Sequence, residues 1–147
     1  MKIVVGADHV GYELKRKVLD KLERDGHEVI DVGCFSPDKV DFPDIARALC
    51  AAILNKKAQR GIMLCGSGVG AAIACNKIRG IRASVVHDIY TAHQCVEHDD
   101  VQVMAVGTRI VGETLALELM DRFLEAVFFD SEDFRIRLKK LEDIEKS

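Results

Sequence analysis

Apolar and polar positions along the chain follow two alternating patterns. Five short apolar runs, several of them closed by glycine, have the length and β-branched character of buried strands. The strands predicted from these runs cover residues 2–5, 28–32, 62–64, 81–86 and 102–106. The segments between them repeat apolar residues at a spacing of about three to four, which is typical of amphipathic helices. The predicted helices cover residues 11–25, 44–57, 71–78, 88–98, 112–128 and 131–146.

Strands that alternate with helices predict an α/β fold in which helices cover both faces of a parallel sheet. A length of 147 residues suits one core, and the chain has no repeat, low-complexity segment or linker. The sequence therefore predicts a single domain, residues 1–147, with three α/β/α layers and a five-stranded parallel sheet.

The last predicted helix carries an apolar stripe but has no following strand to cover. The stripe consists of Phe134, Leu138, Leu141 and Ile144. An exposed stripe of this kind is typical of a subunit interface. An amphipathic helix also commonly packs on its own domain. The sequence leaves both interpretations open.

Residues 61–76, which read GIMLCGSGVGAAIACN, combine the end of a strand, a glycine-rich turn and the start of a helix. In an open parallel sheet, ligands bind at the carboxyl ends of the strands, where this turn lies. Successive backbone N–H groups and the positive end of the helix dipole favour negative charge there. We expect Gly66, Gly68 and Gly70 to form this turn, with the Cys65 sulfur facing it.

Further polar residues follow the ends of other predicted strands and are expected at the same edge of the sheet. They are Asp8 and His9 after the first strand, Ser67 beside Cys65, and Arg109 after the fifth strand. A thiol, an imidazole, a carboxylate and a guanidinium beside backbone amides suit proton transfer on a small anionic substrate. Structural interpretations compete: Cys65 as a small buried hydrophobe, Asp8 as a helix cap, and His9 as a turn residue.

Several potential metal ligands occur close together in the second half of the chain. They are His87, Asp88, His93, Cys95 and His98. Only Cys95 and His98 share a helical face, and no HExxH or CxxC motif occurs, so we expect no metal. The GSGVG turn also lacks the GxGxxG spacing of a dinucleotide site. His98 and Asp99 precede the fifth strand, so topology alone does not bring them to the strand ends.

Composition narrows the choice of partners. The net charge is −3, Trp is absent and no basic block occurs, so nucleic acid and anionic membrane surfaces are disfavoured. The first apolar run is too short for a signal peptide, and no stretch approaches the roughly 20 apolar residues of a membrane span. Five cysteines without metal-type spacing, in a chain without an export signal, predict reduced thiols in a cytoplasmic protein.

Four segments together resemble the type-B ribose-5-phosphate isomerase family, which includes the subunits of galactose-6-phosphate isomerase. The segments are GADHVGYELK, VDFPD, LCGSGVGAAIACNKIRGIRA and VGTRIVG. The similarity covers nearly the whole chain. It implies a Rossmann-like fold and a homodimer or tetramer with sites shared between subunits. It also implies interconversion of ribose 5-phosphate and ribulose 5-phosphate through an enediolate, with no metal or organic cofactor.

The resemblance assigns roles to the residues of the glycine turn. Cys65 matches the base that moves a proton between C1 and C2, and Ser67 matches the hydroxyl residue beside it. One branch of the family uses a glutamate after the turn as the base, and this chain has Ala71 at that place. The backbone amides from Gly66 to Gly70 would hold the oxyanion of the enediolate.

The resemblance also assigns roles to residues outside the turn. Asp8 matches a residue that binds sugar hydroxyls, and His9 matches one near the phosphate. His98 matches the acid/base that opens the sugar ring. Arg109 and Arg137 match phosphate-binding arginines, and Arg137 would reach in from the partner subunit. This arrangement would explain the tail helix as part of a subunit interface.

The chain departs from the family pattern at three places. Asp99 replaces the Asn of a His-Asn pair at a substrate-binding position, and Phe42 replaces the Tyr of Asp-Tyr-Pro. The tail pattern Arg-His-x-x-Arg begins here with Asp133 and Phe134. A carboxylate in place of a phosphate-binding guanidinium reverses a charge-assisted contact.

These departures leave three alternatives open. The first is an isomerase of another sugar, such as allose or galactose 6-phosphate, a tetrose phosphate or a free sugar. The second is a non-catalytic protein that binds a sugar phosphate. The third is a subunit that needs a different partner chain.

Overall fold

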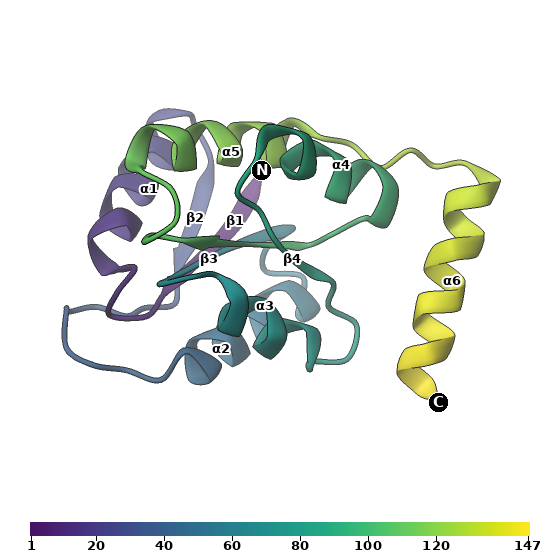
Figure 1. Ribbon diagram of the computed structural model, residues 1–147, viewed down its shortest axis with the longest axis horizontal. Coiled ribbons are helices and arrows are strands. Elements are labelled where there is room, and N and C mark those ends of the chain that lie inside the picture. The colour runs from purple at the N-terminus through teal and green to yellow at the C-terminus, as the bar shows by residue number, and fades with distance from the viewer.

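The computed structural model describes residues 1–147 and contains one five-stranded sheet in which all neighbouring strands are parallel (Figure 1). The strands are β1 (Lys2–Ala7), β2 (Glu28–Asp31), β3 (Arg60–Cys65), β4 (Ala83–Val85) and β5 (Val103–Gly107). Their order across the sheet is β2-β1-β3-β5-β4. The chain thus builds to one side of β1 and then to the other. The topological switch point lies between β1 and β3, where an open α/β sheet has its binding crevice.

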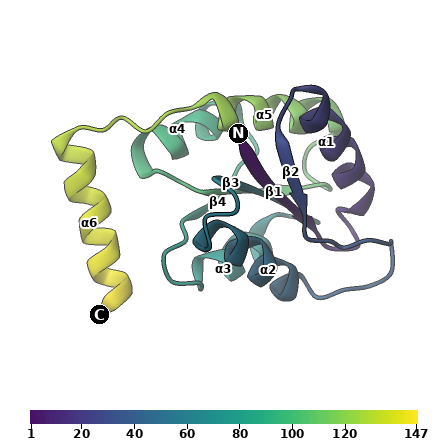
Figure 2. The same cartoon turned by 180° about the vertical axis from the view of Figure 1, so that it is seen from behind.

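Helices cover both faces of this sheet, as the alternating pattern predicts. The helices are α1 (Tyr12–Arg24), α2 (Phe42–Leu54), α3 (Val69–Asn76), α4 (Ile89–Asp99), α5 (Glu113–Glu125) and α6 (Glu132–Lys146). α1, α4 and α5 pack on one face, and α2 and α3 pack on the other (Figures 1 and 2). The predicted three-layer, Rossmann-like α/β/α fold is confirmed.

The strand interiors are apolar on both faces because both faces are covered. Along β3, Ile62 and Leu64 belong to the core under α1, α4 and α5, whereas Met63 belongs to the core under α2 and α3. All three side chains are buried. The continuous apolar run at residues 62–64 is therefore the signature of a central parallel strand.

Two helices, α2 and α5, each end three residues before their predicted ranges do. α2 begins at Phe42 rather than residue 44, because Pro43 lies in its first turn, where a missing N–H leaves no hydrogen bond unmade. α2 ends at Leu54, and Lys56 beyond it has a left-handed backbone with φ 58°. α5 ends at Glu125 rather than residue 128. The Arg60 guanidinium donates to the carbonyls of its last residues and of Ala126.

One charged residue lies in the core against the pattern of its helix. The Lys15 side chain of α1 is only 2% exposed, and its Nζ contacts both carboxylate oxygens of Asp31 at 2.7 Å. Asp31 ends β2 and also accepts from the Gly33 N–H at 2.9 Å. A buried lysine needs such a paired partner, so this ion pair fixes α1 against the edge strand of the sheet.

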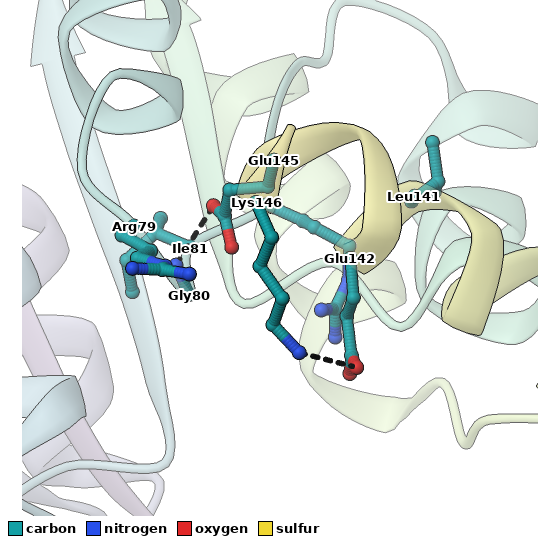
Figure 3. A pocket seen from close by; sticks show the side chains of 8 residues that line it. Arg79, Gly80, Ile81, Leu141, Glu142, Glu145 and Lys146 are labelled. Atoms are coloured by element: carbon teal, nitrogen blue, oxygen red, sulfur yellow. Dashed lines mark hydrogen bonds and ion pairs between the residues drawn. The ribbon is translucent and has the colours of Figure 1, made fainter.

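α6 stands apart from the layers, with none of its residues buried (Figures 1 and 2). It is held at both ends. Before it begins, the Phe129 N–H donates to the Glu97 carbonyl at 2.9 Å; near its end, the Gly80 N–H donates to Glu145 Oε1 at 2.9 Å. A pocket of about 360 Å³ separates this end from the loop before β4 (Figure 3).

The apolar stripe of α6 packs on its own domain only near the start of the helix, where Phe134 stacks on His98 of α4. Leu141 is 45% exposed and Ile144 is 70% exposed. The structure thus shows local packing for the first part of the stripe only, and the subunit interface stays a prediction. No helix of the structure is long and apolar enough to span a bilayer.

Arg60 offers a test of how the helix layer is tied to the sheet. Its guanidinium donates to the carbonyls of Phe123, Leu124 and Ala126 and lies 5.4 Å from the centre of the Phe123 ring. We expect Arg60→Met to lower the free energy of unfolding by about 3 kcal/mol, because carbonyl groups lose charge-assisted partners. Urea denaturation measures this loss.

The matched control is Arg122→Met, which removes an exposed ion pair to Glu125. We expect it to cost less than about 1 kcal/mol. Equal losses in the two variants would contradict the role of Arg60.

Candidate active site at the carboxyl ends of the strands

Three neighbouring strands end together and bring the first candidate residues side by side. Ala7 is opposite Leu64 in the β1–β3 pair, and Cys65 is opposite Gly107 in the β3–β5 pair. The Asp8 N–H continues the ladder by donating to the Leu64 carbonyl at 3.1 Å. Asp8 and Cys65 therefore lie on either side of the switch point, as predicted for residues that follow parallel strands. We call this edge the strand-end site.

The glycine turn places a backbone amide against the thiol. The Gly68 N–H donates to Cys65 Sγ at 3.1 Å, and Cys65 is only 5% exposed. Gly68 is the residue before α3 and has a left-handed backbone with φ 79°. Because α3 begins at Val69, the positive end of its dipole faces the thiol. Such surroundings favour a bound anion.

Two other glycines allow the turn to approach its neighbours. A Cβ on Gly107 would lie 2.6 Å from the Ser67 carbonyl group, and a Cβ on Gly70 would lie 2.7 Å from the Phe42 ring. The Ser67 side chain is exposed, and its Oγ accepts from the Val69 N–H at 3.2 Å. The turn thus presents Ser67 to solvent beside the buried thiol.

Asp8 and His9 shape the loop on the β1 side of the site. Asp8 is 7% exposed, and its Oδ1 accepts from the N–H groups of Val10 (2.9 Å) and Gly11 (3.1 Å) just before α1. This is a turn-stabilising role of the kind that the sequence left open. His9 Nδ1 accepts from the Val40 N–H at 3.3 Å. His9 therefore ties the β1 turn to the loop before α2.

The β5 side of the site supplies a free cation and a residue that the sequence did not single out. The Arg109 N–H donates to the Gly66 carbonyl at 3.0 Å, and its Cδ lies 3.8 Å from the position of a Cβ on Gly66. Its exposed guanidinium thus lies over the turn. Thr108 donates its N–H to the Cys65 carbonyl at 2.8 Å and its hydroxyl to the Val10 carbonyl at 3.3 Å. Thr108 joins all three strand ends.

His87 is a second residue of this edge that the sequence analysis considered only as a metal ligand. It follows the end of β4, and its Nε2 accepts from the Gly107 N–H at 2.8 Å. Burial lowers the pKa of His87 below 6.5, against a smaller opposing effect of Asp88. Its place directly after a predicted strand, residues 81–86, is the signal that would have found it.

His98 and Asp99 lie at the opposite end of the strands, near their amino ends. The Asp99 carbonyl accepts from Arg82 Nε at 2.8 Å, just before β4 begins. Strands rise about 3.3 Å per residue, so the length of β5 separates this end from Cys65 by roughly 13 Å. The structure therefore does not bring these two residues to Cys65 of the same chain.

His98 instead belongs to a group with two residues of α6. Its ring stacks on the Phe134 ring at a centroid distance of 4.6 Å and an interplanar angle of 19°. Arg137 Cζ lies 5.1 Å from the centre of the same Phe134 ring. We call His98, Phe134 and Arg137 the α4–α6 cluster. The predicted site residues thus fall into two separate groups.

The potential metal ligands of residues 87–98 have different partners. His93 Nδ1 pairs with Glu97 Oε2 at 2.9 Å, and His98 Nδ1 contacts Gln94 Nε2 at 2.8 Å. Cys95 is buried against the Ala92 carbonyl, and burial raises the pKa of this thiol to about 11. No three His, Cys, Asp or Glu side chains are grouped in a way that could hold a metal ion.

A parallel sheet with a thiol, a carboxylate and an amide turn at its switch point is the arrangement expected of an α/β protein that acts on a small anion. A family model described as Ribose/Galactose Isomerase matches residues 3–141. The chain belongs to this family, and it is an aldose–ketose isomerase of sugar phosphates.

Individual relatives carry more than one name. A ribose-5-phosphate isomerase B of Escherichia coli is 41% identical over 127 residues, 86% of this chain and 85% of that protein. A D-erythrulose-4-phosphate isomerase of Pectobacterium atrosepticum is 39% identical over 130 residues, 87% of this chain and 85% of that protein. The structure of Clostridium thermocellum ribose-5-phosphate isomerase B has a TM-score of 0.97 at 42% identity, with 99% and 98% of the two chains covered.

The hydrogen bond of His87 predicts a pH dependence of stability. Protonation of Nε2 removes the acceptor of the Gly107 N–H. Because the pKa of His87 is lowered in the folded chain, the unfolded chain takes up this proton first as the pH falls below about 6.5. The contribution is fully present above that value and is lost as the pH falls through the folded pKa.

We therefore expect His87→Gln, which keeps an acceptor that does not titrate, to lose less stability than the wild type between about pH 7.5 and about pH 5. Urea midpoints at the two pH values give the comparison. The other titrating groups are common to both proteins and cancel in the difference. Equal losses would show that His87 does not carry this dependence.

Proposed function

We propose that this protein interconverts ribose 5-phosphate and ribulose 5-phosphate through an enediolate, with Cys65 as the base. The observation that carries the proposal is the Cys65 thiol, which receives the Gly68 N–H at the start of α3 and lies opposite Gly107. It occupies the place of the proton-transferring base in the family pattern. Ala71, in place of a glutamate, leaves no competing carboxylate there. Relatives named ribose-5-phosphate isomerase B support the choice of sugar.

The proton transfer uses groups that the strand-end site holds together. The Cys65 thiolate removes the proton from C2 of the open-chain aldose, and the electron pair moves onto the carbonyl oxygen at C1 to give an enediolate. The backbone amides of the turn stabilise that oxygen, as an oxyanion hole does. The proton of the C2 hydroxyl then moves to the C1 oxygen, which places the negative charge on the C2 oxygen. The thiol returns its proton to C1 as the C2 carbonyl forms, which yields the ketose. Ser67 and Asp8 bind the hydroxyl groups.

Phosphate binding and ring opening require residues from a second copy of the chain. In this proposal Arg109 of one copy and Arg137 of the other bind the phosphate, while His98 of the other copy opens the ring and Asp99 contacts the sugar beside it. The separation of the two groups within one chain supports this division. His9 lies near the phosphate on the first copy. The assembly is a homodimer or a tetramer of such dimers.

Exposed apolar surface supports the same assembly. An apolar groove of about 740 Å³ runs between α2 and α3, with Phe42, Leu54 and Ile73 among its lining residues. Ile73 is 56% exposed and Val69, at the start of α3 beside the site, is 51% exposed. Surfaces of this kind are typical of interfaces.

The second candidate function is isomerisation of a different sugar phosphate. A contact of Arg135 supports this candidate. Asp133 stands where the family has a phosphate-binding arginine, and Arg135 does not compensate for it. The Arg135 guanidinium instead contacts Asp130 Oδ1 at 2.6 Å and the Asp130 carbonyl at 3.2 Å. The relative named for D-erythrulose 4-phosphate makes a shorter sugar the first alternative to test.

Deuterium exchange from solvent tests the chemistry and the substrate together. We expect deuterium at C2 of ribose 5-phosphate, or C1 of ribulose 5-phosphate, by NMR in D₂O. Exchange only with erythrose 4-phosphate, allose 6-phosphate, galactose 6-phosphate or free ribose would identify that sugar instead. No exchange with any of them would reject the proposed function.

Cys65→Ala should reduce turnover by about 10³-fold, because it removes the base from proton transfer. Calorimetry should still detect substrate binding. The control is Cys95→Ala, which removes a buried thiol of α4 outside the strand-end site and should retain exchange. Persistent turnover in Cys65→Ala would reject this residue as the base.

Mixing two inactive variants tests whether sites are shared. Cys65→Ala and Arg137→Ala homodimers each lack one half of every site. After subunit exchange, mixed dimers contain one intact site, and we expect activity to recover to about a quarter of the wild-type value. A mixture that stays inactive, although light scattering shows mixed dimers, would place both residues in the same subunit's site.

A further inference from the structure

Phe134 has an unusual position among the residues that the proposed mechanism uses. Its ring lies parallel to the His98 ring within 19°, with the two centres 4.6 Å apart. Phe129 packs on His98 from a second direction at 5.8 Å. His98 and Phe134 are both half-buried, and they come from different helices, α4 and α6. The stack therefore fixes the plane of the imidazole through a contact between two elements.

A second contact fixes which nitrogen of His98 is available. The Gln94 side-chain amide, one turn earlier on α4, contacts His98 Nδ1 at 2.8 Å. That contact leaves Nε2 as the nitrogen for proton transfer. Stacking thus fixes the plane of the His98 ring, and the contact with Gln94 fixes which way the ring is turned within that plane.

The same phenylalanine also holds the arginine. Arg137 Cζ lies 5.1 Å from the centre of the Phe134 ring, within the range of a cation–π contact. Arg135 is turned to Asp130 and does not take part. A flexible exposed arginine loses conformational freedom when it binds a ligand. A contact that orders it beforehand reduces that loss.

We propose that Phe134 is a positioning residue that holds His98 and Arg137 as one preassembled unit, which enters the strand-end site of a second copy. The inference rests on the proposed function, because it assigns ring opening to His98 and phosphate binding to Arg137. Phe134 itself touches neither the reacting carbon atoms nor the phosphate. It sets the distance and orientation between the group that opens the ring and the group that anchors the other end of the sugar.

Comparing the two sugars of the proposed reaction distinguishes the positioning role of Phe134 from proton transfer, because only one of the sugars must be ring-opened. Ribose 5-phosphate closes a five-membered ring through its O4 and must be opened before it reacts. Ribulose 5-phosphate stays open, because the hydroxyl at C5 that would close its ring carries the phosphate. Turnover of ribose 5-phosphate therefore depends on ring opening, whereas solvent exchange at C1 of ribulose 5-phosphate depends on Cys65 and the amide turn alone.

Phe134→Leu keeps an apolar side chain but removes the aromatic face. We expect kcat for ribose 5-phosphate to fall by about 10- to 100-fold, because His98 loses its orientation. The rate of C1 exchange in saturating ribulose 5-phosphate should stay within about threefold of wild type. KM should rise for both sugars, because Arg137 loses its contact. Phe134→Tyr should restore all three values.

Phe128→Leu is the matched control, because Phe128 lies 6.5 Å from Phe134 and makes no ring contact with His98. It should leave kcat for ribose 5-phosphate near wild type. The inference is overturned if Phe134→Leu turns over ribose 5-phosphate like the control, or if turnover and exchange fall by the same factor. A wild-type protein that exchanges neither pentose phosphate would instead reject the proposed function.

Discussion

The strand-end site depends on the close approach of two backbone segments, the turn after β3 and the end of β5. A side chain on Gly107 would collide with the Ser67 carbonyl group, and a Cβ on Gly68 would lie 3.2 Å from the Gly107 nitrogen. Gly68 must also adopt a left-handed backbone, which glycine does without steric cost. Only with hydrogen at these positions does the Gly68 N–H reach the Cys65 sulfur. The position of the turn amides against the thiol is therefore a consequence of one tight backbone contact.

The parallel sheet imposes a second constraint, which divides the candidate residues. Residues that follow strands gather at the carboxyl ends of the strands. Residues at the ends of the covering helices gather at the amino ends of the strands. α4 carries His98 away from Cys65, and α6 holds Phe134 against that histidine and Arg137 against Phe134. One chain therefore contains both residue groups of the proposed mechanism, the strand-end site and the α4–α6 cluster, but does not bring them together. The exposed end of the α6 stripe, Leu141 and Ile144, and the apolar groove between α2 and α3 are the surfaces available to join two copies.

Much of the fold follows from local patterns in the sequence. The strand and helix order was predictable because central strands are continuous apolar runs and the helices repeat their apolar positions at the helical period. Local patterns were wrong or silent where a distant residue decides the outcome. α5 is shorter than its apolar pattern because Arg60, from β3, takes the carbonyls at its end. Lys15 is buried because Asp31 of the neighbouring strand pairs with it.

The sequence by itself determined the order of the elements, the glycine turn and the presence of Asp8, Cys65 and Arg109 at strand ends, because these features depend on neighbours in the chain. The tertiary structure decided what those residues contact. It brought His87 to the Gly107 N–H, and it stacked the Phe134 ring of α6 on the His98 ring of α4. Contacts of this kind join residues about 20 to 40 positions apart. No local pattern of apolar and polar residues records them, because they depend on how the layers pack.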